Sequence, residues 1–257
     1  MEVFAVEGLP EVRPGDDVAE LVVERTDLRD GDVVCVASTI VSKANGRQAS
    51  LSSYEPSEQA VRIAESIEAV AGEEKDPRLA QAIIEECEEV LVEAPFVLGV
   101  TRFGHITVNA GIDRSNVPDA DLLLLPENPT AEAEAIRAGI RERTGVAPAV
   151  IVTDTSGRPF RLGQRGVALG WAGLPASRDW RGEHDREGRE LEATVQAVVD
   201  ELAAAANLVT GEGDGGTPVA VVRGFEFGDH AASEQLFRDP EKDVVRKALR
   251  EWSHARD

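Results

Sequence analysis

Short runs rich in β-branched residues alternate irregularly with amphipathic stretches along the whole chain. Asp32–Ile40 follows the turn signal Asp30-Gly31 and predicts a buried strand. Further β-rich runs, separated by Gly and Pro, cover 90–100, 106–110, 122–125, 149–152 and 218–222. Helical spacing and capping residues predict helices over 57–70, 77–91, 130–144, 187–209 and 243–252. Because several predicted strands follow one another directly, a mixed α+β architecture fits better than a regular βαβ winding.

The chain is long enough to bury a substantial core, with 257 residues and 42% hydrophobic content. No internal repeat, low-complexity segment or flexible linker divides it. We therefore expect a single domain over 1–257, built as two interleaved lobes without a clean linker between them.

The charge is strongly acidic, with 48 Asp and Glu against 27 Lys and Arg and a formal net charge of -21. Such a charge repels the phosphate backbone of nucleic acids, so we expect no nucleic-acid partner. Excess carboxylates and the preference for Arg over Lys together resemble proteins adapted to high salt, where screening weakens self-repulsion. The charge indicates a habitat and gives no information about the reaction.

The predicted location is the cytoplasm. The N-terminal segment lacks the basic and apolar regions of a signal peptide, and no run approaches the roughly 18 apolar residues that a membrane span needs. Cys35 and Cys87 lie far apart, without a CxxC motif or a His at metal-ligand spacing, and are interpreted as buried structural thiols in a reducing compartment.

Three acidic residues lie at predicted strand ends and in glycine-rich turns: Asp113 in NAGIDRSN, Asp154 in VIVTDTSG and Glu212 in GEGDGG. Mg²⁺ and Mn²⁺ prefer oxygen ligands, and Asp154 with Thr155 offers a carboxylate and a hydroxyl directly. The alternative for Asp154 is a local role, in which the carboxylate caps the turn after its strand. The sequence alone leaves open whether the three acids converge.

Gly211, Gly213 and Gly216 satisfy the GxGxxG pattern, but they follow a helix and lead into a strand, which is the wrong context for a dinucleotide-binding motif. The backbone N–H groups of such a turn could still bind phosphate while Glu212 holds a metal ion, although a plain acidic surface turn is an equal alternative. Ser38, Thr39 and Lys43, just past the first predicted strand, could also reach phosphate. No P-loop, zinc-protease, nucleophile-elbow or catalytic-cysteine motif occurs.

Six segments in order across nearly the whole chain resemble the F420-0:γ-glutamyl ligase family. They are GLPEVRPGDD (8–17), STIVSKANGR (38–47), NAGIDRSNV (109–117), TDTSGRPFRLGQRGVALG (153–170), DREGRELEATV (185–195) and ANLVTGEGDGGTPVAVVRG (206–224). The resemblance implies a two-lobed subunit in an intertwined homodimer, with a fold unlike those of ATP-grasp and Mur-type ligases.

The resemblance also implies site residues. Asp113 and Asp154 match ligands of one divalent metal ion, and Thr155 and Glu212 match ligands of a second, with Mg²⁺ or Mn²⁺ expected at two ions per subunit and K⁺ as a candidate monovalent ion. Thr210 departs from the family pattern, in which a bulkier apolar residue such as Met is expected. The positions that match GTP contacts are Leu9, Pro10, Glu11, Val12, Ser38, Thr39, Lys43, Asn116, Thr210, Gly211, Glu212, Gly213, Asp214, Gly215, Gly216 and Thr217.

The implied reaction joins L-glutamate to the lactyl-phosphate carboxylate of coenzyme F420-0. GTP phosphorylates that carboxylate to an acyl phosphate, glutamate displaces phosphate, and GDP is the other product. Lys43 and Asp154 are the expected catalytic residues: Lys43 and the metal ions, one of them held by Asp154, neutralise charge on the transferring phosphoryl group without a protein nucleophile. The alternatives are a metal-dependent GTP hydrolase and a non-catalytic GTP-binding protein. The number of glutamates added stays open.

Overall fold

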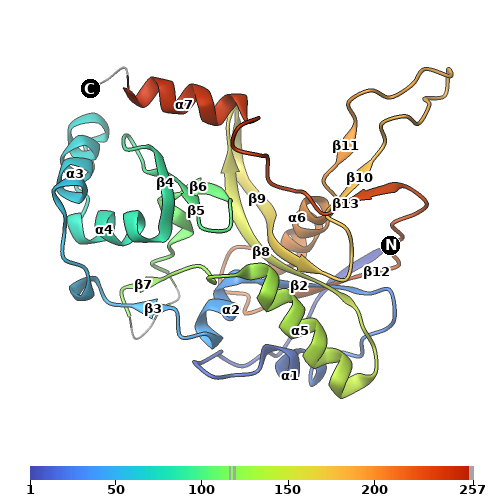
Figure 1. The fold of residues 1–257 in the computed structure, drawn as a ribbon. Helices are drawn as coiled ribbons and strands as arrows, with labels where there is room; N and C mark the ends of the chain where they lie inside the picture. The colour runs from blue at the N-terminus through green and yellow to red at the C-terminus, as the bar shows by residue number, and fades with distance from the viewer. Residues whose placement is uncertain (116, 118–119, 255–257) are drawn as a thin grey trace. The chain divides into compact units, whose positions relative to one another are not determined.

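The computed structural model describes residues 1–115, 117 and 120–254. The chain forms two compact units (Figure 1). Unit 1 contains Met1–Asn45 and Asn128–Leu236, and unit 2 contains Gly46–Glu127 and Phe237–Asp257. Each unit contains helices and more than one sheet, which confirms the predicted mixed α+β architecture.

Unit 1 is built on a five-stranded sheet. In spatial order its strands are β1 (Glu2–Ala5), β12 (Val219–Arg223), β2 (Val33–Ala37), β8 (Ala149–Arg158) and β9 (Arg161–Ala172). Strands β2 and β8 run parallel, and the other three neighbouring pairs are antiparallel. Strands β1, β2 and β8 therefore point the same way and end at the same edge of the sheet.

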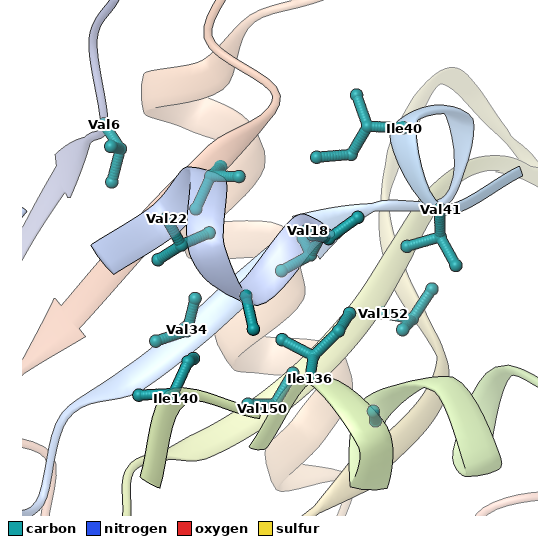
Figure 2. Close-up of a cluster of buried hydrophobic side chains, with 14 of the residues drawn as sticks. Val6, Val18, Val22, Val34, Ile40, Val41, Ile136, Ile140, Val150 and Val152 are labelled. Carbon is teal, nitrogen blue, oxygen red and sulfur yellow. The ribbon is translucent and has the colours of Figure 1, made fainter. Parts of the chain in front are cut away.

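Helices cover both faces of this sheet, which explains why its inner strands read as continuous apolar runs. Along β2, Val34 and Val36 belong to one core, whereas Val33 and Cys35 belong to the other. The first core lies under α1 (Val18–Val23), α2 (Ser38–Ala44) and α5 (Pro129–Thr144), and Figure 2 shows its side chains converging from these helices and the sheet. The second core lies under α6 (Val198–Thr210).

Strand β9 carries a one-residue bulge that changes which face its side chains meet. Val152 pairs with Gly170 but the next residue of β8, Thr153, pairs with Ala168, so one residue of β9 has no partner. A Cβ at Gly166 would lie 2.3 Å from the Ala203 carbonyl oxygen of α6, and one at Gly170 would lie 2.2 Å from the Pro129 carbonyl carbon of α5. The bulge thus lets both helices approach the same strand closely from opposite sides.

A second sheet of unit 1, in the order β11-β10-β13, corrects one prediction. Its strands are β10 (Ser177–Asp179), β11 (Val195–Gln196) and β13 (Ala231–Ser233). The helix predicted over 187–209 begins only at Val198, and the preceding residues form a hairpin. Asp185 turns that hairpin by accepting hydrogen bonds from the backbone N–H groups of Glu187 and Arg189, at 2.9 and 2.8 Å.

Other predicted boundaries were also wrong. The strand predicted over 32–40 ends at Ala37, and helix α2 replaces the predicted loop around Lys43. The turn predicted at 155–157 is part of β8, because β9 continues to pair with it. The helix predicted over 77–91 ends at Glu86, since Cys87–Val92 pairs with a neighbouring strand as β4. Cys87 is half-buried, not fully buried as expected.

Unit 2 combines helices with two small antiparallel sheets. Helices α3 (Glu58–Ala71) and α4 (Pro77–Glu86) form a hairpin, and β4 pairs with β5 (Leu98–Thr101), which pairs with β6 (Ile106–Val108). Strand β3 (Gln48–Ala49) and the 3₁₀ turn η1 (Leu51–Ser53) precede α3, whereas the 3₁₀ turn η2 (Asn109–Gly111) and β7 (Leu122–Leu123), which pairs with β3, follow β6. The last helix is α7 (Val244–His254). Within the described residues, no helix has both the length and the apolar character for crossing a membrane.

Glu89 of β4 attaches α7 to the rest of unit 2. Its carboxylate accepts hydrogen bonds from Arg246 Nε at 2.9 Å and Arg250 Nη2 at 2.8 Å, and both guanidiniums make further contacts with it. The hydrogen bonds from Arg250 and Arg246 lower the pKa of Glu89 from an ordinary 4.5 to about 2, against the opposing effect of burial. The charged form of Glu89 is therefore part of the folded state.

We predict that Glu89→Gln lowers the free energy of unfolding at neutral pH. A carboxyl group with a depressed pKa stabilises the fold above its unfolded pKa, and this contribution disappears as the pH falls from about 4.5 towards 2. Since the side chain is partly exposed, we expect a loss of about 1 to 2 kcal/mol after allowance for solvent screening. Urea denaturation at constant KCl measures it. Glu88→Gln, the same change at the exposed neighbouring residue, is the control, and equal stability of the two variants would contradict the prediction.

Candidate nucleotide and metal site

Most of the sequence-predicted site residues of unit 1 lie at one edge of its sheet. Residues 9–12 follow the end of β1, Ser38 and Thr39 follow the end of β2, and Thr217 precedes the start of β12. The hydrogen bonds Val6 N to Val219 O and Ala37 N to Pro218 O, both 2.8 Å, hold these ends side by side. The carboxyl ends of parallel strands commonly bind ligands in α/β sheets, and this edge has that position.

Asp154 emerges at the same edge. Ala37, the last residue of β2, is opposite Thr153 of β8, so Asp154 lies one residue beyond the end of β2, where α2 begins. Successive side chains of a strand point to opposite faces. Asp154 therefore faces the same side as Val152 and the α2 core, and Thr155 faces the α6 side, where its partner Gly166 meets α6. The Asp154 carboxylate and the Thr155 hydroxyl therefore lie on opposite faces of the sheet.

A local hydrogen bond also involves Asp154. The backbone N–H of Thr155 donates to Asp154 Oδ1 at 2.8 Å, the kind of contact that the alternative local role requires. One carboxylate oxygen can accept more than one hydrogen bond or ligand, so this contact is compatible with a bound metal ion.

Lys43 and Glu11, both predicted nucleotide contacts, form an ion pair. Lys43 Nζ lies 2.5 Å from Glu11 Oε1, and the Lys43 side chain is 10% exposed whereas that of Glu11 is 63% exposed. Lys43 is held in the last turn of α2, and the adjacent Ala44 carbonyl accepts a hydrogen bond from Gly15 N at 2.8 Å. A buried ammonium with an exposed partner can exchange that partner for a phosphate oxygen.

The glycine-rich loop joins the end of α6 to the start of β12. Gly211 and Gly216 adopt positive φ values of 70° and 63°, which glycine accepts without strain. The loop closes through Thr217 Oγ1, which donates to the Thr210 carbonyl at 3.2 Å. Glu212 Oε1 accepts from Asn207 Nδ2 at 2.7 Å. Thr210, where the resemblance leads us to expect a bulkier apolar residue, is the last residue of α6, and Gly213, Asp214 and Gly215 are exposed.

Asp113 belongs to unit 2. Its backbone pairs with Leu123 at 3.0 and 2.8 Å, and both carboxylate oxygens accept from the Ser115 hydroxyl at 2.8 and 2.9 Å. Because Asp154 and Glu212 belong to unit 1, the convergence of all three acids stays a prediction. Asn116, a predicted GTP contact, lies outside the described residues.

The donors present suit a hard divalent cation. Asp154, Thr155, Glu212 and Asp113 offer only oxygen atoms, which Mg²⁺ and Mn²⁺ prefer. In the described part of the chain, no three His, Cys, Asp or Glu side chains gather into a ready-made metal site. Mg²⁺ commonly takes one or two carboxylates and completes its coordination with water and substrate phosphates, so the residues fit an ion that binds together with a nucleotide.

Two supporting residues escaped the sequence analysis. Asn207 holds Glu212, and Asp200 of α6 accepts a hydrogen bond from the Ala168 N–H at the bulge, at 2.9 Å. Burial raises the pKa of Asp200, although the Ala168 N–H and Arg165 oppose the shift. An acidic residue in the first turn of a helix is common enough that no sequence signal distinguishes Asp200.

We predict that Asp200→Ala destabilises the protein by about 1 to 3 kcal/mol, because it leaves the Ala168 N–H without an acceptor. Asp200→Asn keeps an oxygen at the same place and removes a carboxylate whose burial is unfavourable, so its cost is smaller. Urea denaturation of both variants and the wild type at constant pH and KCl measures the difference. Equal destabilisation by Ala and Asn would contradict the role of the hydrogen bond.

Comparisons with known proteins show the family to which the chain belongs. The family model described as F420-0:Gamma-glutamyl ligase matches residues 8–224. The chain is 86% identical to the coenzyme F420:L-glutamate ligase of Haloarcula marismortui over 257 residues, which is the full length of both chains. It is 48% identical to that of Archaeoglobus fulgidus over 250 residues (97% of this chain and 98% of the relative), and 43% identical to that of Methanosarcina mazei over 252 residues (97% and 96%). This chain therefore belongs to the F420-0:gamma-glutamyl ligase family.

Proposed function

We propose that this chain is a GTP-dependent coenzyme F420-0:L-glutamate ligase of coenzyme F420 biosynthesis. The names of its full-length relatives supply the coenzyme and the amino acid. The observation that carries the proposal is the sheet edge at which β1, β2 and β8 end and β12 begins. The elements that carry the hydroxyls, the buried lysine, Asp154 and the glycine-rich loop begin or end at that edge. These are the groups that phosphoryl transfer needs for positioning and charge stabilisation.

In the proposed first step, a carboxylate oxygen of the acceptor attacks the γ-phosphorus of GTP. The new O–P bond forms as the bond to the β–γ bridging oxygen breaks, so the products are an acyl phosphate and GDP. Lys43 would exchange Glu11 for an oxygen of the transferring phosphoryl group and offset its negative charge. The backbone N–H groups of 211–216 would orient the neighbouring phosphates.

Asp154 with Asp113, and Thr155 with Glu212, are the residues that would hold divalent metal ions. Bound Mg²⁺ or Mn²⁺ would supply Lewis-acid neutralisation of the phosphate oxygens. Asn207 would keep Glu212 oriented, and the bulge at Ala168 would keep Asp154 and Thr155 on their respective faces.

In the second step, the glutamate amine attacks the acyl carbon, loses a proton, and phosphate leaves with the C–O bond electrons. Activation by phosphate makes amide formation favourable without a covalent enzyme intermediate, which accounts for the lack of a nucleophile motif in the sequence. The family resemblance leads us to propose a homodimer as the functional form.

The test combines the purified chain with GTP, Mn²⁺, L-glutamate and coenzyme F420-0 in KCl-rich buffer. We predict a glutamyl mass increment on the deazaflavin and GDP formation that needs both glutamate and the acceptor. Asp154→Asn should reduce the rate by about 100-fold or more, because a carboxylate that would hold a divalent metal ion at the phosphates is lost. Asp229→Asn, the same charge change at an exposed residue of unit 1, is the matched control.

GTP hydrolysis that proceeds equally without glutamate and acceptor would favour the hydrolase alternative, and nucleotide binding without turnover would favour the binding protein. Full activity of Asp154→Asn would show that the site has been misplaced. Far-UV circular dichroism of each variant establishes that loss of activity is not loss of fold.

A further inference from the structure

The β8–β9 hairpin of unit 1 continues past the end of β2, and its tip (residues 158–162) exposes two large apolar side chains (Figure 1). Phe160 and Leu162 are fully exposed, at 105% and 99%, the highest values among the large hydrophobic side chains of the described residues. Apolar surface in water is unfavourable, and two such side chains side by side at one turn are typical of a binding surface.

The backbone at Phe160 favours glycine. Arg158 pairs with Arg161, so Pro159 and Phe160 are the two central residues of the turn. Phe160 has a φ of 66°, a value that bulky residues rarely adopt and that glycine usually provides at the second central position of a turn. Because the side chain is also fully exposed, neither packing nor backbone conformation explains a phenylalanine here.

Two arginines flank the turn without a carboxylate partner. Arg158 and Arg161 lie directly opposite each other, and like charges in such a pair repel. Arg158 Nη1 donates to the Gly163 carbonyl at 3.1 Å, which holds the guanidinium at the tip. Within the described part of the chain, no Asp or Glu pairs with either arginine, whereas Arg165 of β9 lies 4.0 Å from Asp200. In a chain with a net charge of -21, two such cations indicate an anion from outside the chain.

Strand β8 connects this tip to the candidate metal site. Alternate side chains of a strand lie on one face, so Asp154, Ser156 and Arg158 share a face of β8. Four residues at about 3.3 Å each place Arg158 about 13 Å along the strand from Asp154. A ligand that contacts both must therefore be long, and the acceptor is such a molecule, with its carboxylate at one end, its ring at the other and a phosphodiester between them.

From these features we infer that the hairpin tip binds the acceptor substrate, with Arg158 and Arg161 at its phosphodiester and with Phe160 and Leu162 against its deazaflavin ring. This inference rests on the proposed ligase function and deepens it. Arginine binds phosphate oxygens through two parallel hydrogen bonds, and an aromatic side chain stacks on a planar ring. With its carboxylate beside Asp154, the acceptor extends along β8 so that its ring reaches the turn.

The order of the strands separates the acceptor from GTP. In the order β1-β12-β2-β8-β9, the expected nucleotide contacts follow β1 and β2 and precede β12, so GTP extends from Asp154 away from the hairpin. L-Glutamate has no ring that could cover Phe160.

A second copy of the chain is a poorer fit for the tip. A stable protein interface buries about 1,200 to 2,000 Å², whereas one aromatic side chain supplies about 150 to 250 Å². The apolar surface of the tip therefore matches a single ring and is too small to hold two chains together by itself.

Equilibrium titrations without turnover test the inference on the full-length protein in KCl-rich buffer. The probes are coenzyme F420-0, the deazaflavin riboside that lacks the phosphodiester, and GTP with Mn²⁺. Phe160→Ala should weaken the binding of both F420-0 and the riboside by about tenfold, because both carry the ring. Arg158→Gln and Arg161→Gln should each weaken F420-0 binding by about tenfold and leave riboside binding within about twofold.

GTP affinity should stay within about twofold in all three variants. The matched controls are Arg186→Gln and Leu208→Ala, which change an exposed arginine and an exposed apolar side chain elsewhere in unit 1. Both controls should bind F420-0 as the wild type does.

Phe160→Gly separates binding from folding. Glycine accepts the observed φ of 66°, and the substitution removes exposed apolar surface. The variant should therefore be at least as stable as the wild type in urea denaturation, although it loses affinity for F420-0 and the riboside. Lower stability would show that the fold requires Phe160, and would contradict the inference.

Unchanged F420-0 affinity in the tip variants, or a loss of GTP affinity in its place, would overturn the inference. Light scattering should give the same oligomeric state for all variants, and dissociation that accompanies the loss of binding would show that the tip is an interface between copies. Failure of the ligase proposal is distinguishable, since it would appear as absent glutamyl product from a wild-type protein that still binds F420-0 through the tip.

Discussion

The parallel pairing of β2 with β8, inside a sheet buried on both faces, is the constraint on which the candidate site depends. It places Ala37 opposite Thr153, and so fixes Asp154 one residue beyond the point where β2 gives way to α2. A slip of one residue would turn Asp154 and Thr155 to the wrong faces, and would also move valines out of both cores. Packing energy and site geometry therefore favour the same register.

The supporting features preserve this register near the site. The bulge in β9 allows Gly166 and Gly170 to face opposite helices, and Asp200 accepts the N–H of Ala168 beside it. The Asn207 side chain donates a hydrogen bond to the Glu212 carboxylate. Such contacts fix the direction of a carboxylate before any ligand binds, which reduces the reorganisation that phosphoryl transfer would otherwise require.

Much of the fold was predictable because the inner strands are continuous apolar runs and the helices carry ordinary caps, such as Ser57 and Asn128. The errors came both from pairing between distant segments and from local structure. Pairing of Cys87 with Thr101 ended a helix early, the Asp185 turn replaced the first part of another, and α2 formed where a loop was expected. The sequence predicted Asp154, Lys43 and Glu212 as site residues, but the bulge, Asp200 and Asn207 depend on contacts that no local pattern encodes.

The account depends most on whether carboxylates distant in the chain share one nucleotide. A crystal structure of the protein with Mn²⁺ and a non-hydrolysable GTP analogue, with Mn²⁺ located by anomalous scattering, tests this directly. The account predicts two Mn²⁺ ions at the terminal phosphates, one bound by Asp154 and Asp113 and the other by Thr155 and Glu212. Ions bound away from the ends of β2 and β8, or Asp154 and Glu212 on surfaces that do not contact the same triphosphate, would contradict it.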